Sequence, residues 1–167
     1  AIARSVPERD AALAPVVSSG RAASLICKPW DRNYQTAPDF VLLEGPLAGG
    51  HLGFSKEEAR EAQAGHPRPL SELLHEVLEA LAPFKDKYRR DIPVFVAGGV
   101  KNGAEMAQYM REGAAGAQFA TRFIATQECD ASDGYKQALL DAKQEDITIV
   151  QSPVGLPGRA LRSPLVQ

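Results

Sequence analysis

The chain has 167 residues, of which 44% are hydrophobic and 24% are charged. This length suits one domain with a buried core, and the composition is average for globular proteins, which excludes disordered and fibrous chains. Its 19 basic and 21 acidic residues give a net charge of -2 with no long block of either sign, so we expect no nucleic-acid partner.

Four short apolar runs, each bounded by turn residues, predict buried strands. The runs are continuous rather than alternating, which is typical of parallel strands that are covered on both faces. They cover residues 12–17, 40–43, 92–97 and 117–120.

Helical patterns separate these runs. Ala22, Ile26 and Trp30 recur every four residues and predict a short helix, which Asp31 and Asn33 would end. Between the second and third strands, Ser71 can cap a longer helix. Its apolar residues form one stripe at the 3.6-residue period: Leu73, Leu74, Val77, Leu78 and Leu81.

Two more helices are predicted towards the C-terminus. Asn102 can cap one of them, which Gly113 would end in the left-handed conformation that glycine tolerates. Ser132 or Asp133 begins the other helix. A short extended piece at 147–150 then opens a C-terminal arm, 147–167, that proline and glycine predict to be irregular rather than a further barrel element.

Strict alternation of strands and helices predicts an α/β fold with a parallel sheet. No GxGxxG follows a strand and no Walker glycine loop is present, so the common nucleotide-binding open sheets lose support and a barrel is favoured. A (β/α)8 barrel needs eight strands and typically about 250 residues, whereas this chain shows four strands. We therefore expect a single α/β domain, 1–167, that contains part of a barrel.

The densest motif, EGPLAGGHLGF, covers residues 44–54 and begins where the second predicted strand ends. Glycines there let the backbone approach a ligand and leave amide donors free for an anion. His51 would stand at the C-terminal mouth of a barrel, where active sites lie, with a side chain suited to proton transfer near neutral pH. The spacing alone equally supports a glycine-rich turn with an incidental exposed histidine.

Two further motifs follow the last two predicted strands. AGGV at 97–100 precedes a helix whose free amides can bind phosphate, although taken alone a tight turn that requires glycine explains it better. QFATRF at 118–123 places Thr121 and neighbouring amides at the end of the fourth strand. Barrels often build a phosphate site from the loops after strands seven and eight, and these two motifs fit that position. Ser18 and Ser19 follow the first strand, but serine there can merely cap the next helix, so both stay outside the predicted site.

Together these motifs resemble the nitronate monooxygenases, formerly called 2-nitropropane dioxygenases. The matching segments are GPLAGGHLGF, IPVFVAGGVKNG, GAAGAQFATRFIAT and the closing SPVGLPGRA. The resemblance covers nearly the whole chain from about residue 12. It implies a (β/α)8 TIM-barrel fold of which this chain holds the second half, strands five to eight, and it implies FMN as the cofactor.

The resemblance also implies roles for single residues. His51 resembles the active-site histidine that acts as a base or orients the substrate. We expect no metal site in this chain. Alanine at position 120 replaces the glycine more usual in the family, but a backbone amide survives the change. The residues implied to bind the cofactor are Gly49, Gly50, Gly98, Gly99, Gln118, Ala120 and Thr121.

The expected function is oxidation of an alkyl nitronate or nitroalkane by molecular oxygen in an FMN-dependent oxidoreductase. One alternative keeps the flavin and the barrel but uses NAD(P)H, as quinone reductases and enoyl-acyl-carrier-protein reductases of the same barrel family do. Another alternative is an inactive half-barrel that binds only phosphate or a partner chain. Because the first half of the family's barrel is absent, we expect self-association or a missing N-terminal half.

The remaining sequence features suggest a cytoplasmic protein. Cys27 and Cys129 lack the paired spacing of a zinc site or a disulfide framework, which fits a reducing compartment. No apolar run approaches the roughly 18 residues of a membrane span, so no membrane partner is expected.

Overall fold

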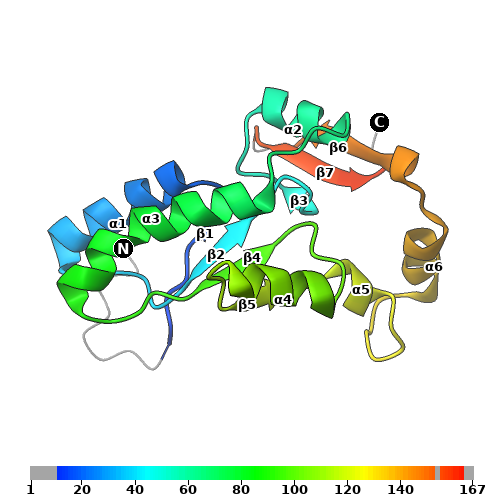
Figure 1. Ribbon diagram of the computed structural model, residues 1–167. Helices are drawn as coiled ribbons and strands as arrows, with labels where there is room; N and C mark the ends of the chain where they lie inside the picture. Colours follow the sequence, from blue (N-terminus) through cyan, green and yellow to red (C-terminus); the bar gives the residue numbers. More distant parts are fainter. Residues whose placement is uncertain (1–10, 153–154, 164–167) are drawn as a thin grey trace.

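The computed structural model describes residues 11–152 and 155–163, and it is built around a four-stranded parallel sheet (Figure 1). The sheet has the order β1-β2-β4-β5. Its strands are β1 (Val16–Val17), β2 (Val41–Glu44), β4 (Val94–Ala97) and β5 (Gly116–Gln118). All four predicted strands are confirmed with different bounds, and the predicted α/β class with a parallel sheet is also confirmed.

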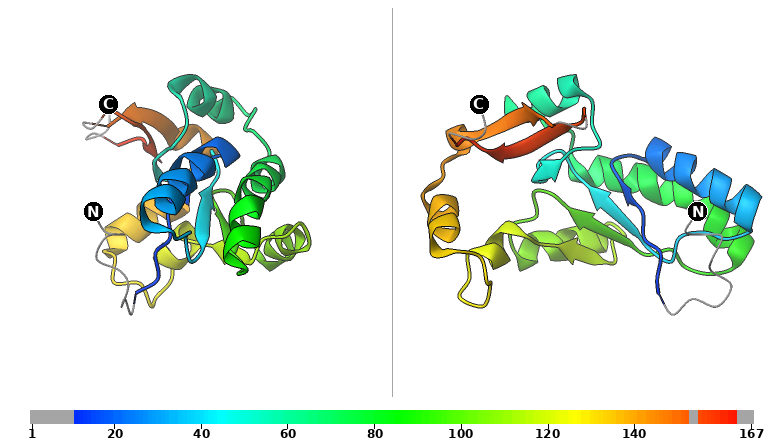
Figure 2. Two further views of the ribbon diagram at one scale, coloured as in Figure 1. Left: turned by 90° about the vertical axis from the view of Figure 1, so that its left-hand side faces the viewer. Right: turned by 180° about the vertical axis from the view of Figure 1, so that it is seen from behind.

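One face of the sheet is covered by helices α1 (Gly20–Tyr34) and α3 (Leu70–Tyr88), which lie side by side in both Figure 1 and Figure 2. Helix α4 (Gly103–Arg111) packs against β5. The side chains that meet between the helices and the sheet are almost fully buried. They include Val17, Val41, Leu43, Val94, Val96, Leu73, Leu74, Val77 and Leu81.

The second face of the sheet is less well covered. The parallel register aligns Val16, Leu42, Phe95 and Gly116 in one row across the four strands, and laterally paired residues point to the same face. Val16 in this row is 55% exposed. Along each strand, successive side chains thus point alternately to the face that the helices bury and to the face that they leave partly open.

Two helix boundaries differ from the sequence prediction. Asp31 and Asn33 do not end α1, because the Asp31 carboxylate accepts hydrogen bonds from Lys87 and Tyr88 of α3 and so does not compete for the helix backbone. Ser71 does not cap α3. That helix begins at Leu70, since Pro69 supplies a preset φ of -58° at the residue before it.

Three other boundary predictions are confirmed. The Asn102 side chain accepts the Glu105 amide at 3.0 Å and caps α4, and Gly113 follows this helix with a φ of +107°. Ser132 caps α6 (Asp133–Asp141) through the Tyr135 amide.

The C-terminal segment is not an irregular arm within the described residues, which corrects the prediction for 147–167. Strands β6 (Ile147–Gln151) and β7 (Pro157–Leu161) form an antiparallel hairpin, and β7 also pairs with β3 (Gly50–His51). Pro157 is tolerated because it opens its strand, where a missing N–H costs little. Of the proline and glycine residues that suggested an irregular arm, Pro157 opens β7, Gly158 lies within it and Gly155 lies between β6 and β7, while Pro153 and Pro164 are outside the described residues.

Shorter elements complete the chain. Helix α2 (Lys56–Gln63) interrupts the long connection after β3, and the Gln63 side-chain amide bonds to the Ile147 carbonyl and the Ile149 amide of β6. Helix α5 (Thr121–Ile124) and the short η2 (Gln144–Asp146) lie between β5 and β6. In the part of the chain that the structure describes, no helix has the length and apolar character needed to cross a membrane.

Candidate functional site

Three of the predicted site motifs leave the same edge of the parallel sheet. Glu44, the last residue of β2, pairs with Ala97 at the end of β4, and Ala97 pairs with Gln118 at the end of β5. The carboxyl ends of neighbouring parallel strands meet at one edge, which is where ligands bind in α/β folds. The loops that follow β2, β4 and β5 therefore start side by side (Figure 1).

The loop after β2 packs directly on the glycine pair after β4. The Gly45 amide donates to the Ala97 carbonyl at 2.9 Å. Gly98 has a φ of +80°, and a Cβ on it would stand 2.8 Å from the Ala48 nitrogen. A Cβ on Gly99, which has a φ of +109°, would stand 3.3 Å from the Leu47 side chain. Packing within the protein thus requires glycine at position 98 and favours it at 99, while phosphate binding by the pair stays a prediction.

Gly49 and Gly50 are in a different situation. Both are exposed, and a Cβ on either residue would meet no described atom within 4 Å. Gly50 has a φ of +82°, so its backbone favours glycine, whereas Gly49 has neither constraint. The space beside these two residues is open to a ligand that passes close to the backbone.

His51 follows in β3, and its side chain is exposed. The strand pairs antiparallel with β7, so that Gly50 is opposite Arg159 and His51 is opposite Gly158. No hydrogen bond joins the imidazole to the described residues, which leaves both ring nitrogens available to a substrate.

The 45–53 loop, which carries His51, is held by contacts from distant parts of the chain. The Arg159 Nη1 donates to the Leu47 carbonyl at 2.9 Å, and the Leu52 amide donates to the Pro157 carbonyl at 2.8 Å. The buried Ser18 hydroxyl donates to the Gly53 carbonyl at 2.6 Å. Ser19 caps α1 through the Ala22 amide, which confirms the expectation that a serine at this position caps the next helix. Ser18 and Arg159 are thus supporting residues that the sequence analysis did not select.

The third motif lies at the end of β5. Gln118 is exposed at the sheet edge, Ala120 precedes α5 as its N-cap residue, and Thr121 is the first residue of that helix. The Ala120 carbonyl accepts the amides of Phe123 and Ile124 at 2.9 and 3.1 Å. Gln118 thus ends β5, which is next to β4, and Ala120 and Thr121 follow it. Gly98 and Gly99 leave β4 towards α4 at the same edge of the sheet.

Glu44 is a further candidate that the sequence analysis named only as the start of a motif. It shares its row across the sheet with Ala97 and Gln118, and burial raises the pKa of its carboxyl. A carboxyl with a raised pKa at a ligand-binding edge can transfer protons nearer to neutral pH. Its signal in the sequence was an acidic residue at the end of an apolar strand.

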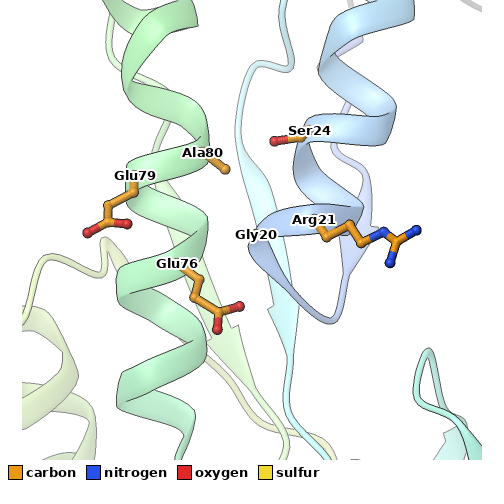
Figure 3. Close-up of a pocket in the computed structure, with 6 residues that line it drawn as sticks. All are labelled: Gly20, Arg21, Ser24, Glu76, Glu79 and Ala80. Carbon is orange, nitrogen blue, oxygen red and sulfur yellow. The ribbon is translucent and has the colours of Figure 1, made fainter.

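A surface groove elsewhere does not belong to this site. It lies between α1 and α3 and is lined by residues of these two helices (Figure 3): Gly20, Arg21, Ser24, Glu76, Glu79 and Ala80. The helices meet closely there, since a Cβ on Gly20 would stand 2.5 Å from the Glu76 carbonyl oxygen. None of the residues predicted from the motifs lines this groove.

Comparison with known proteins connects this geometry to one family. The family model described as nitronate monooxygenase matches residues 3–167. The solved structure of FabK from Thermotoga maritima is similar with a TM-score of 0.70 and 28% identity, and the match covers 98% of this chain and 43% of that chain. A nitroalkane oxidase from Streptomyces ansochromogenes has a TM-score of 0.65 and 29% identity, over 90% of this chain and 38% of that one.

A curated relative from Rhodococcus jostii adds a different activity. It is described as a (3aS,4S,5R,7aS)-5-hydroxy-7a-methyl-1-oxo-octahydro-1H-indene-4-carboxyl-CoA dehydrogenase and is 34% identical over 128 residues, which are 77% of this chain and 30% of the relative. The chain thus spans less than half the length of each protein compared. The matched family is one of flavin-dependent oxidoreductases.

Proposed function

The chain belongs to the nitronate monooxygenase family, and from that premise we propose that it is the phosphate-binding half of an FMN-dependent oxidoreductase that oxidises alkyl nitronates with molecular oxygen. The observation that supports this proposal most is the meeting of three loops at one sheet edge, where β2, β4 and β5 end side by side.

The residues at this edge suit a flavin mononucleotide. Backbone amides of Gly98, Gly99, Ala120 and Thr121 would hold its phosphate, and a positive φ at both glycines turns the backbone as in anion-binding loops. The open space at Gly49 and Gly50 would admit the ring, and Gln118 at the end of β5 would lie beside the glycine pair that follows β4. The bound flavin would supply the redox chemistry, and the protein would supply binding and orientation.

His51 would act on the substrate. An imidazole nitrogen would remove the proton alpha to the nitro group of a neutral nitroalkane, or would donate a hydrogen bond to the oxygens of a nitronate. Its exposed position on β3 lets that proton exchange with solvent. The short β3 strand fixes the backbone of His51 through its pairing with β7.

We also propose that the chain works as half of a (β/α)8 barrel, completed by an N-terminal half or by a second copy. The partly open sheet face supports this, since Val16 is 55% exposed at the edge strand β1. The edge strands β1 and β5 each have only one partner in the described sheet, and closure of a barrel would pair them both.

A reductase that uses NAD(P)H is the second candidate. The 34% identity to a carboxyl-CoA dehydrogenase supports it, because that name describes a redox reaction other than nitronate oxidation. Steady-state assays with propionate 3-nitronate and oxygen, against NADH with a quinone or an enoyl thioester, separate the two activities. Turnover in the NADH assay together with no turnover of propionate 3-nitronate would refute the nitronate proposal.

The cofactor proposal is tested by the visible spectrum of the purified protein, taken with the native mass. We expect a yellow oxidised flavin when the barrel is complete, and weak retention or none by this chain alone. A completed barrel that stays colourless after incubation with FMN would contradict the proposal and leave an inactive half-barrel as the better description.

A further inference from the structure

Arg159 joins two parts of the chain that are more than a hundred residues apart. It lies on β7, where its Cα is paired with Gly50 on one side and with Ile149 on the other. Its Nη1 reaches past β3 and donates to the Leu47 carbonyl at 2.9 Å. One residue thus contacts the 45–53 loop twice, through the strand backbone opposite Gly50 and through its side chain at Leu47.

The contact removes the charged guanidinium of Arg159 partly from water, which is energetically unfavourable. Arg159 is half-buried, and burial lowers the pKa of its guanidinium. Among the described residues, no carboxylate forms an ion pair with it, so the Leu47 carbonyl is its hydrogen-bond partner. A charged donor that is withdrawn from water for a single backbone acceptor makes a stronger bond than a neutral donor would.

Leu47, which accepts this hydrogen bond, also packs against the predicted phosphate-binding loop at Gly98 and Gly99. The Leu47 side chain packs at 3.3 Å from the position of a Cβ on Gly99, and Ala48 packs in the same way on Gly98. A shift of the Leu47 backbone would therefore displace the segment that separates Gly98 and Gly99 from His51.

We infer that Arg159 is a positioning residue, whose hydrogen bond to the Leu47 carbonyl holds the 45–53 loop on the C-terminal hairpin and so determines the position of His51. Its catalytic consequence rests on the proposed function of His51. The placement of the 45–53 loop does not depend on that function, because the hydrogen bond forms in the chain without flavin.

The test compares R159M, which keeps much of the apolar stem and removes the donors, with R162M as the matched control. Arg162 lies one residue beyond β7 and is exposed. In R159M we expect the amides of residues 47–53 to exchange with deuterium about tenfold faster or more, as for loss of a charged hydrogen bond, while β2 and β4 stay protected. R162M should leave exchange unchanged. Exchange in R159M equal to that of the unmodified chain would overturn the inference.

A spectroscopic measurement follows His51 itself. The chain has three histidines, so the imidazole Cε1–H signals of His66 and His75 serve as internal references in NMR spectra. We expect only the His51 signal, assigned with H51N, to move in R159M, and three unmoved signals would refute the inference. If R159M does not fold, R159Q serves in both measurements with the same criteria, since its shorter side chain does not reach Leu47. Both are recorded without flavin, so a failure to bind flavin would refute only the proposed function.

Discussion

Replacement of Gly98 by alanine is the sharpest test of the contact between the two glycine-containing loops. The new Cβ would stand 2.8 Å from the Ala48 nitrogen and 2.9 Å from the Gly45 carbonyl oxygen, both of them backbone atoms that cannot rotate away. A φ of +80° adds about 1–2 kcal/mol for a residue with a Cβ, and overpacking adds about 1–3 kcal/mol. We therefore expect G98A to lower the free energy of unfolding by about 2–5 kcal/mol.

Two neighbouring glycines separate these contributions. Gly50 has a φ of +82° but open space around it, so G50A should cost only the conformational part, about 1–2 kcal/mol. Gly49 has neither constraint, and G49A should change stability by less than about 0.5 kcal/mol. The assay is urea unfolding followed by circular dichroism, with the slope compared among variants. A G98A variant as stable as G49A would refute the packing argument.

Four further predictions concern the site and its supports. H51N should lower turnover about 10²–10⁴-fold in the completed flavin enzyme while the flavin spectrum persists, and unchanged turnover would remove His51 from the mechanism. S18A should cost about 1–3 kcal/mol in urea unfolding because the Gly53 carbonyl loses its donor, and equal stability would show that water replaces the hydroxyl. Burial raises the pKa of the Glu44 carboxyl, so this group lowers the free energy of unfolding only where it must ionise in the folded chain. The chain keeps its full stability below the usual carboxyl pKa and loses part of it as the pH rises through the raised pKa. E44Q should then gain stability over the unmodified chain at pH 7 but not at pH 4, and an equal gain at both values would exclude ionisation as the cause. Lys87 and Tyr88 lower the pKa of Asp31 by hydrogen bonding, so D31N should lose stability at pH 7 and less as the pH falls, while a pH-independent loss would contradict the electrostatic cause.

The strands and most helix ends could be predicted because local signals carry them. Continuous apolar runs marked the four buried strands, and Asn102 and Ser132 capped helices through their own side chains. The predicted helix α1 is present, and only its predicted end was wrong, because Asp31 is bound by residues of α3 that lie 56 and 57 positions away. The extended piece predicted at 147–150 is confirmed as β6, but its pairing with β7 was missed because no local pattern of residue types distinguishes a strand partner from a loop.

By itself, the sequence determined that the motifs containing Gly49, Gly98 and Thr121 follow the carboxyl ends of parallel strands and hence begin at one edge of the sheet, whereas His51 lies in β3, which pairs with the C-terminal hairpin. The apolar runs and the turn residues that bound them are local properties of the chain. Only the tertiary structure decided that β7 pairs with β3, that Arg159 reaches Leu47, and that Gly98 is required by Ala48 rather than by a ligand alone. These contacts join residues 50 or more positions apart, and their energies depend on distances that no local pattern of residue types encodes.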